Sequence, residues 1–150
     1  MKALKRILLV EDNLKDIDLT LAALEEHHLA NEVVVARDGV EALDYLHSRG
    51  KFAGREPGLP AVMLLDIKMP KLNGLEVLRQ MKSDPGLKNL PVVMLTSSRE
   101  EPDLATSYEL GANAYVVKPV DFQQFVDAVK QVGAFWAVLN EPPPGKTPAG

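Results

Sequence analysis

The chain has 150 residues, 46% of them hydrophobic, which is enough apolar material for one well-packed core rather than two. The formal net charge is -4 at pH 7, which argues against nucleic acid as a partner, because proteins that bind its phosphates usually present a basic face. The absence of cysteine excludes disulfides, thiolate metal ligands and cysteine nucleophiles.

The first ten residues carry three cationic side chains but reach Glu11 and Asp12 after only four apolar residues. This apolar run is too short for the core of a signal peptide. No stretch of the chain approaches the length of a membrane span. We therefore expect a cytoplasmic protein that does not act at a membrane.

Five short apolar runs recur along the chain, at residues 7–10, 33–36, 61–65, 92–95 and 114–117. They are rich in Val, Ile, Leu and Met and do not alternate strictly with polar residues, which is typical of strands covered on both faces. The runs therefore predict the strands of a parallel sheet.

Segments with the apolar spacing of helices lie between and after these runs. Their stripes are Ile17, Leu21 and Leu24; Ala42, Leu43 and Leu46; Val77, Leu78 and Met81; Leu104, Tyr108 and Ala112; and a longest one from Phe122 to Trp136. Asp38 with Glu41, and Asp121 with Gln124, have the spacing of a capping box, which marks a helix start. A strand followed by a helix, five times over, predicts an open α/β sheet with right-handed crossovers.

Two segments stand outside this alternation. Residues 48–60 contain three glycines and two prolines and are expected to form an exposed loop, which as a plain insertion would cost little entropy. Residues 141–150 contain four prolines and no apolar periodicity, so we expect a flexible tail after a single domain at residues 1–140.

Polar side chains stand at the carboxyl ends of four of the five predicted strands. Since ligands of open α/β sheets bind at this edge, we expect these side chains to converge there. They are Glu11 and Asp12, then Asp66, then Thr96 and Ser97, and finally Lys118 and Pro119.

The acidic members of this set predict a metal site. Three carboxylates close together repel one another, so a cation must offset them. Mg²⁺ takes carboxylate, carbonyl and water oxygens and often bridges to a phosphate. We expect Asp12 and Asp66 to bind Mg²⁺, or Mn²⁺ in its place, directly and Glu11 through water. The backbone carbonyl of Lys68 could complete the site, and Lys118 supplies a second positive charge.

Phosphoryl transfer needs an in-line nucleophile and oriented positive charge or donors on the phosphoryl oxygens. Asp66 suits the nucleophile, because a carboxylate can form an acyl phosphate, and Thr96 and Lys118 would meet the phosphoryl oxygens. Taken singly, Asp66 is typical of a turn, Lys118 of a solvated surface and Thr96 of a strand end. Their joint placement, one at each successive strand end, favours the functional interpretation.

These residues resemble the receiver domains of two-component response regulators, the CheY-like family. The resemblance covers about residues 5–133. It rests on Glu11-Asp12, on residues 65–70 followed by Asn73-Gly74, on residues 95–97 and on residues 111–119. The resemblance implies the flavodoxin-like fold, a doubly wound (βα)5 five-stranded parallel sheet with strand order 2-1-3-4-5.

The resemblance also implies a function in a phosphorelay. Asp66 would accept a phosphoryl group from the phosphohistidine of a sensor histidine kinase, with Mg²⁺ on Asp12 and Asp66. Thr96 would move toward this group, Tyr115 would turn inward and Lys118 would pair with the phosphate. Such a protein is a signalling phosphoacceptor that promotes its own phosphorylation and dephosphorylation, not an enzyme acting on another substrate. Lys118-Pro119 is implied to be a cis peptide.

Two residues depart from the CheY pattern. Lys68 stands where a neutral polar side chain is common, and Ser98 lies beside the pocket. The metal contact at position 68 should survive, because a backbone carbonyl supplies it. Both positions bear on the lifetime of the phosphorylated state.

Three features look like the single-domain regulators of phytochrome-type histidine kinases: the loop at 48–60, the segment 107–113 and the pair Phe135-Trp136. With no output domain after the last helix, we expect the chain to signal by binding a partner. Such relatives are often homodimers, so Phe135 and Trp136 on the C-terminal helix are candidates for a dimer interface. Packing within the chain is the alternative, because Trp136 continues the apolar stripe.

Two other protein classes remain as alternatives. A haloacid dehalogenase-type phosphohydrolase also uses a strand-end aspartate as nucleophile, but it requires a second aspartate two residues later, where this chain has Lys68. A flavodoxin-like carrier requires a glycine-rich phosphate loop after the first strand, where this chain has Glu11-Asp12-Asn13.

Overall fold

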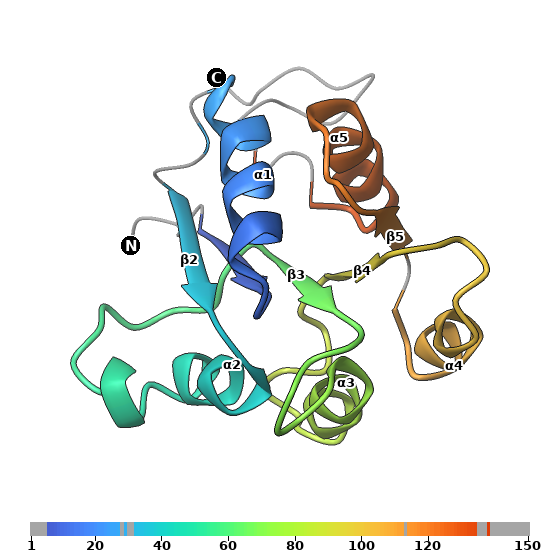
Figure 1. Cartoon of the computed structure of the whole chain (residues 1–150). Coiled ribbons are helices and arrows are strands. Elements are labelled where there is room, and N and C mark those ends of the chain that lie inside the picture. The colour runs from blue at the N-terminus through green and yellow to red at the C-terminus, as the bar shows by residue number, and fades with distance from the viewer. Residues whose placement is uncertain (1–5, 28, 30–31, 113, 135–137, 139–150) are drawn as a thin grey trace, which may run out of the picture.

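The computed structural model describes residues 6–27, 29, 32–112, 114–134 and 138. Strands and helices alternate along the described chain, as the sequence predicts (Figure 1). In order they are β1 (Ile7–Val10), α1 (Leu14–Glu25), β2 (Val33–Ala36), α2 (Gly39–Leu46), the short 3-10 helix η2 (Gly50–Phe52), β3 (Val62–Asp66), α3 (Gly74–Lys82), β4 (Val92–Thr96), α4 (Asp103–Glu109), β5 (Ala114–Val117) and α5 (Phe122–Gln131).

Within the described residues, five parallel strands form one sheet in the order β2-β1-β3-β4-β5. The predicted fold class and strand order are confirmed. Two strands end one residue later than their apolar runs, because Asp66 and Thr96 still pair with their neighbours, Asp66 with Leu95 and Thr96 with Val117. Both polar residues therefore stand on the sheet itself.

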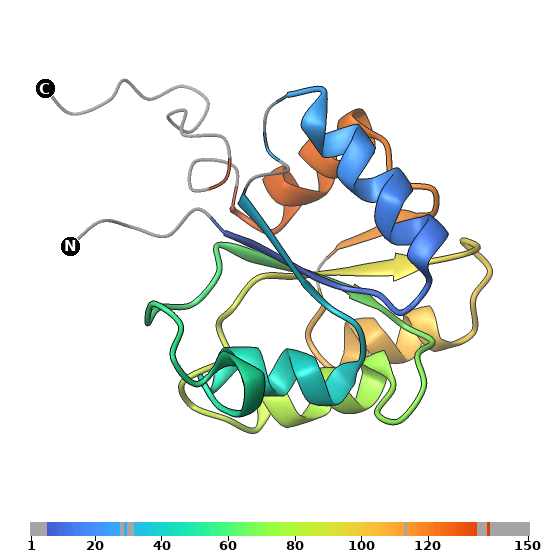
Figure 2. The same cartoon turned by 60° about the vertical axis from the view of Figure 1, so that its left-hand side comes forward.

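The sheet is covered on both faces, which explains the absence of polar alternation in its strands. Helices α1 and α5 cover one face, and α2, α3 and α4 cover the other (Figures 1 and 2). Successive residues of β1 serve opposite cores: Ile7 and Leu9 belong to the core under α1 and α5, whereas Leu8 and Val10 belong to the other.

The two predicted capping boxes form only in part. The side chains of Asp38 and Asp121 accept hydrogen bonds from the backbone amides of Glu41 and Gln124, as predicted. The return bond to the backbone amide of the cap residue is absent in both. The carboxylate of Glu41 accepts from the backbone amide of Arg37, and the side-chain amide of Gln124 donates to the Asp121 carboxylate. One good cap bond is enough to start each helix.

The loop at residues 48–60 has more structure than predicted. Residues 50–52 form the 3-10 helix η2, and the Arg55 guanidinium lies 4.0 Å from the centre of the Tyr45 ring. Arg55 Nε also donates a hydrogen bond of 2.8 Å to the carbonyl of Tyr45. The insertion is therefore fixed to the end of α2, although most of its residues are exposed.

Two predicted apolar stripes extend beyond their helices. Tyr108 lies on α4 but is exposed, and Ala112 follows the end of that helix. The stripe from Phe122 continues past Gln131, the last residue of α5, but Phe135, Trp136 and the tail at residues 141–150 lie outside the described residues. Among the helices that the structure describes, none has the length and apolar character needed to cross a membrane.

Candidate functional site

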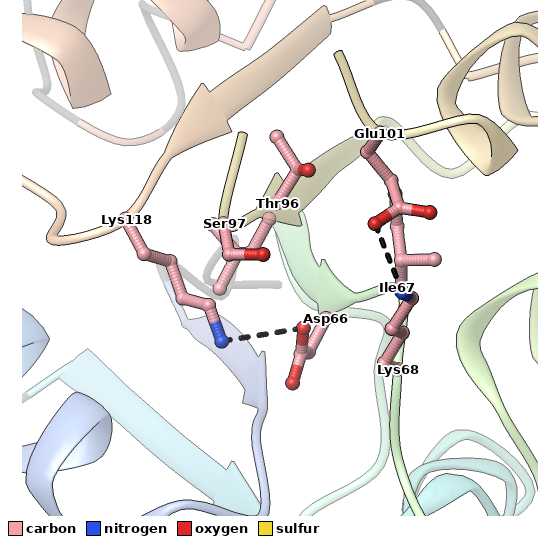
Figure 3. A pocket seen from close by; sticks show the side chains of 8 residues that line it. Asp66, Ile67, Lys68, Thr96, Ser97, Glu101 and Lys118 are labelled. Atoms are coloured by element: carbon pink, nitrogen blue, oxygen red, sulfur yellow. Dashed lines mark ion pairs between the residues drawn. The ribbon is translucent and has the colours of Figure 1, made fainter. Parts of the chain in front are cut away.

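The carboxyl edge of the sheet brings together the predicted residues of β1, β3 and β5. Glu11 follows β1, Asp66 ends β3 and Lys118 follows β5. Lys118 Nζ lies 3.0 Å from Glu11 Oε1 and 3.4 Å from Asp66 Oδ1. It also pairs with Asp16 Oδ2 at 3.1 Å, and Figure 3 shows the lysine reaching toward Asp66. One cation therefore serves three carboxylates.

Backbone contacts hold this arrangement in place. The amide of Lys118 donates a 2.8 Å hydrogen bond to the carbonyl of Thr96, and the predicted cis peptide between Lys118 and Pro119 is confirmed. On the other side, the start of α3 lies so close to Asp66 that a Cβ on Gly74 would be 2.2 Å from the Asp66 carbonyl oxygen. Only glycine permits this approach of backbone to backbone.

The surroundings raise the pKa values of both Asp66 and Lys118, for different reasons. Burial, together with the neighbouring Glu11 carboxylate, raises the pKa of Asp66 to about 7, although Lys118 opposes the shift. Burial alone would lower the pKa of Lys118, but Asp66, Glu11 and Asp16 raise it above its usual range. Lys118 therefore stays positively charged. The negative charge of Asp66 is only partly offset by Lys118, because burial and Glu11 outweigh that attraction.

The acidic groups have the composition and spacing of a magnesium site. Ligand oxygens of Glu11, Asp12 and Asp66 all lie within 4.8 Å of one another. Glu11 is already engaged, since Oε1 pairs with Lys118 and Oε2 accepts from the amide of Asn13. No described residue donates to the Asp12 carboxylate or to the backbone carbonyl of Lys68. The Asp12 carboxylate and that carbonyl are thus free hard-oxygen ligands of the kind that Mg²⁺ prefers, and Asp66, which shares Lys118 with Glu11, lies beside them.

A cavity of about 60 Å³ opens beside Asp66 and is large enough for a small group. Its lining combines the ends of β3 and β4 with the loop that leads to α4 (Figure 3). Thr96 lies on this lining, but its hydroxyl donates 2.8 Å to the carbonyl of Ser98. The hydroxyl would have to give up this bond to reach a group on Asp66.

Tyr115 lies apart from this cavity. The ring is half-buried, packs against the core under α2, α3 and α4, and contacts Tyr108 edge to face at 6.4 Å between centroids. It lines a separate hollow of about 280 Å³ between β5 and α5, together with Arg99 and Gln124. The structure therefore places Tyr115 on a neighbouring surface and not within reach of Asp66.

Two charged residues of the site were missed by the sequence analysis. Asp16 could have been found, because it lies in the first turn of α1, four residues after Asp12 and at the same edge of the sheet. Glu101 carried no signal: it lies in the loop before α4, and its place beside the cavity depends on the course of that loop.

Residues 7–130 match the family described as the response regulator receiver domain. The match spans all the elements that build the site. It removes the phosphohydrolase and the flavodoxin-like carrier as alternatives.

Individual relatives agree with the family match. The chain is 37% identical over 132 residues to the response regulator Rcp1 of Synechocystis sp., covering 88% of each protein. It is 62% identical to the bacteriophytochrome response regulator AtBRR, with a TM-score of 0.84 over 93% of this chain and 100% of the other. The phosphorylated cyanobacterial phytochrome response regulator RcpA is 44% identical, with a TM-score of 0.71 over 89% and 94%. The Mn²⁺-bound form of Rcp1 has a TM-score of 0.68 at 36% identity, over 95% and 98%.

Proposed function

Because the chain belongs to the family of response regulator receiver domains, we propose that it is a signalling switch phosphorylated on Asp66. The donor is a sensor histidine kinase, and the receiver promotes its own phosphorylation and later dephosphorylation. The phosphorylated protein then acts by changing which partner binds to its surface.

One observation carries this proposal: Asp66 is a buried carboxylate that shares a small cavity with Thr96 and Lys118 and a carboxylate cluster with Glu11 and Asp12. A structural aspartate at a strand end would normally be solvated, or paired well enough to stay ionised. Asp66 instead has a pKa raised to about 7 by burial and by Glu11, although Lys118 lies 3.4 Å away. Perturbed groups in a cleft of this kind mark functional sites.

The transfer forms a bond from an Asp66 carboxylate oxygen to phosphorus, while the bond from phosphorus to the donor atom breaks. With a phosphohistidine donor, the imidazole leaves with the electron pair of the broken P–N bond. Lys118 holds a positive charge beside the phosphoryl oxygens, which stabilises the negative charge on them in the transition state. Thr96 exchanges its bond to Ser98 for one to the phosphoryl group.

Asp12, Asp66 and the carbonyl of Lys68 are the groups that would hold Mg²⁺, with Glu11 acting through water. Bound there, Mg²⁺ would neutralise carboxylate charge and polarise the phosphoryl oxygens. The same oxygen ligands suit Mn²⁺, and a Mn²⁺-bound structure exists for the relative Rcp1.

The signal reaches the surface through Thr96 and Tyr115. When the Thr96 hydroxyl moves toward the phosphoryl group, it gives up its hydrogen bond to the Ser98 carbonyl, and the side chain leaves room beside β5. The half-buried Tyr115 ring then turns inward, away from the hollow between β5 and α5 that it now lines.

The similarity to phytochrome response regulators supports a phytochrome-type kinase as the donor. A cytoplasmic setting stays a prediction. The domain limits, residues 1–140 with a flexible tail at 141–150, stay predictions. So does a homodimer through the C-terminal segment, because Phe135 and Trp136 lie outside the described residues.

The test is the intact mass of the protein after incubation with acetyl phosphate and Mg²⁺. We expect a single labile phosphoryl adduct on the wild type, which does not form when EDTA is added before the phosphodonor and is absent in Asp66→Asn. The matched control is Asp18→Asn, which changes an exposed aspartate of α1 and should retain the adduct.

An adduct that persists in Asp66→Asn would overturn the site assignment. Absence of any adduct on the wild type, with Mg²⁺ present, would overturn the phosphoacceptor function as a whole.

A further inference from the structure

Helix α4 starts differently from the other described helices. An Asn or Asp side chain at the first cap position accepts a hydrogen bond from the backbone in α1, α2, α3 and α5. In α4 that position is Pro102, which makes no side-chain cap bond, and the helix is only seven residues long. Short helices without a cap are marginal, so another contact must hold this one.

Glu101 provides that contact. Its Oε1 accepts a hydrogen bond of 3.3 Å from the amide of Asp103, the first residue of α4. Its Oε2 pairs with Lys68 Nζ at 3.2 Å, and its backbone carbonyl accepts from the amide of Leu104. Glu101 thus joins the start of α4 to the loop after Asp66.

This pair lies at the edge of the phosphoacceptor cavity. Lys68 and Glu101 both line the cavity beside Asp66, and Figure 3 shows their contact on the side of Asp66 that faces away from Lys118. The Glu101 side chain is only 8% exposed, whereas that of Lys68 is 72% exposed. The carboxylate is therefore confined near the reacting group, while the lysine is free to reorient.

We propose that the Lys68 side chain, which pairs with Glu101 before phosphorylation, moves to contact the phosphoryl group on Asp66. This movement releases the cap that Glu101 provides for helix α4. This inference rests on the proposed phosphorylation of Asp66. It adds one cation at the phosphoryl group. It also means that the β4–α4 loop would move for two causes, the change at Thr96 and the loss of the Glu101 contact.

Electrostatics sets the direction of the exchange. Phosphorylated Asp66 carries about two negative charges where the carboxylate carried one, so at equal distance it attracts Lys68 about twice as strongly as the single charge of Glu101. The long lysine stem reorients at little cost because most of it is in solvent. Glu101 then faces a dianion without its partner, and the like charges drive the carboxylate away from the cavity and from the Asp103 amide.

Lys71, a second lysine of the loop after Asp66, belongs to a matched pair that lacks the proposed role. Lys71 pairs with Asp38 at 3.4 Å, with side chains 70% and 10% exposed, and Asp38 caps α2. Neither residue lines the cavity beside Asp66. The Lys71–Asp38 pair therefore has the chemistry of the Lys68–Glu101 pair without its position.

The experiment measures the rate of phosphorylation by acetyl phosphate in the full chain with Mg²⁺, by intact mass, in wild type, Lys68→Gln, Glu101→Gln and the control Lys71→Gln. We expect Lys68→Gln to slow the reaction several-fold, because a cation is lost. Glu101→Gln should accelerate it, because Lys68 is released and an anion leaves the mouth of the cavity. Lys71→Gln should match the wild type.

A pair with only a structural role would move both rates in the same direction, since either variant breaks the same contact. That result, or equal rates in all four proteins, would overturn this inference while the adducts themselves still supported the proposed function. A wild type that takes no phosphoryl group would overturn both.

Hydrogen exchange at the Asp103 amide gives a second readout. Phosphorylation should accelerate this exchange in the wild type, and by a smaller factor in Glu101→Gln, whose neutral amide is not repelled. An Asp103 amide that exchanges equally before and after phosphorylation of the wild type would overturn the release of the cap.

Discussion

The acidic half of the site is Glu11, Asp12, Asp66 and Lys118, and its other half is the β4–α4 segment, residues 96–104. In the acidic half, Glu11 and Asp66 are buried at the ends of central strands, and glycine at position 74 lets α3 press against Asp66. In the β4–α4 segment, residues 97–100 are exposed and the helix that follows has no cap at Pro102.

This difference separates the chemistry from the signal. A phosphoacceptor needs its carboxylates and its lysine in fixed positions, because misplaced groups lose most of their effect on a transition state. A switch needs an element whose two arrangements differ little in free energy. The sheet provides the first, and a weakly held loop beside the same cavity provides the second.

The largest expected effect comes from Lys118, the cation on which the acidic half depends. Lys118→Met keeps the length of the side chain but leaves Glu11 and Asp66 buried without their partner. We expect a loss of about 3 kcal/mol in the free energy of unfolding at pH 8 in metal-free buffer. Urea unfolding measures this loss.

Mg²⁺ should restore part of the loss, because it offsets the same carboxylates. Lys15→Met, at an exposed site on α1, is the control and should unfold like the wild type. An unchanged stability of Lys118→Met would mean that the acidic half is not held by this cation.

Asp66→Asn tests the repulsion within the acidic half, and the effect should be a gain in stability. Because burial and Glu11 raise the folded-state pKa of Asp66 to about 7, the ionised group destabilises the fold at high pH. Relative to the variant, the wild type therefore loses stability as the pH rises from about 4, near the unfolded-state pKa, to about 7.

We expect Asp66→Asn to be more stable than the wild type by about 2 kcal/mol at pH 8 without metal, and equally stable at pH 4. Thermal or urea unfolding across this pH range measures the difference. A difference that does not vary with pH would show that Asp66 does not titrate as its surroundings require.

The contrast between the two halves also explains what the sequence could predict. Glu11, Asp66, Thr96 and Lys118 stand at strand ends, and the topology of an α/β sheet alone brings such positions to one edge. The apolar runs that precede these residues could be recognised as strands, because strands buried on both faces have a distinctive composition. The strand order and the phosphorelay came from the family resemblance instead.

Glu101 was not predictable by these means, because its position depends on a loop whose course no local pattern specifies. The exposure of Tyr108 was missed for a related reason: α4 ends at Glu109, so the stripe that continues to Ala112 does not lie on one helix face. Sequence reasoning was thus strongest for the fixed half of the site and weakest for the β4–α4 segment.

The smallest expected effect compares the cap of α3 with that of α4. Asn73→Ala removes a 3.0 Å hydrogen bond that the Asn73 side chain accepts from the backbone amide of Glu76, and it should cost about 1 kcal/mol of unfolding free energy. Glu101→Ala removes a 3.3 Å hydrogen bond and an ion pair whose lysine is mostly in solvent, so it should cost about 0.5 kcal/mol.

Urea unfolding at equal m-values measures both costs. Glu109→Ala, at the exposed end of α4, is the control for side-chain removal on that helix. If Glu101→Ala costs as much as Asn73→Ala, the start of α4 is held as firmly as that of α3, and the movement of the β4–α4 segment must come from Thr96 alone.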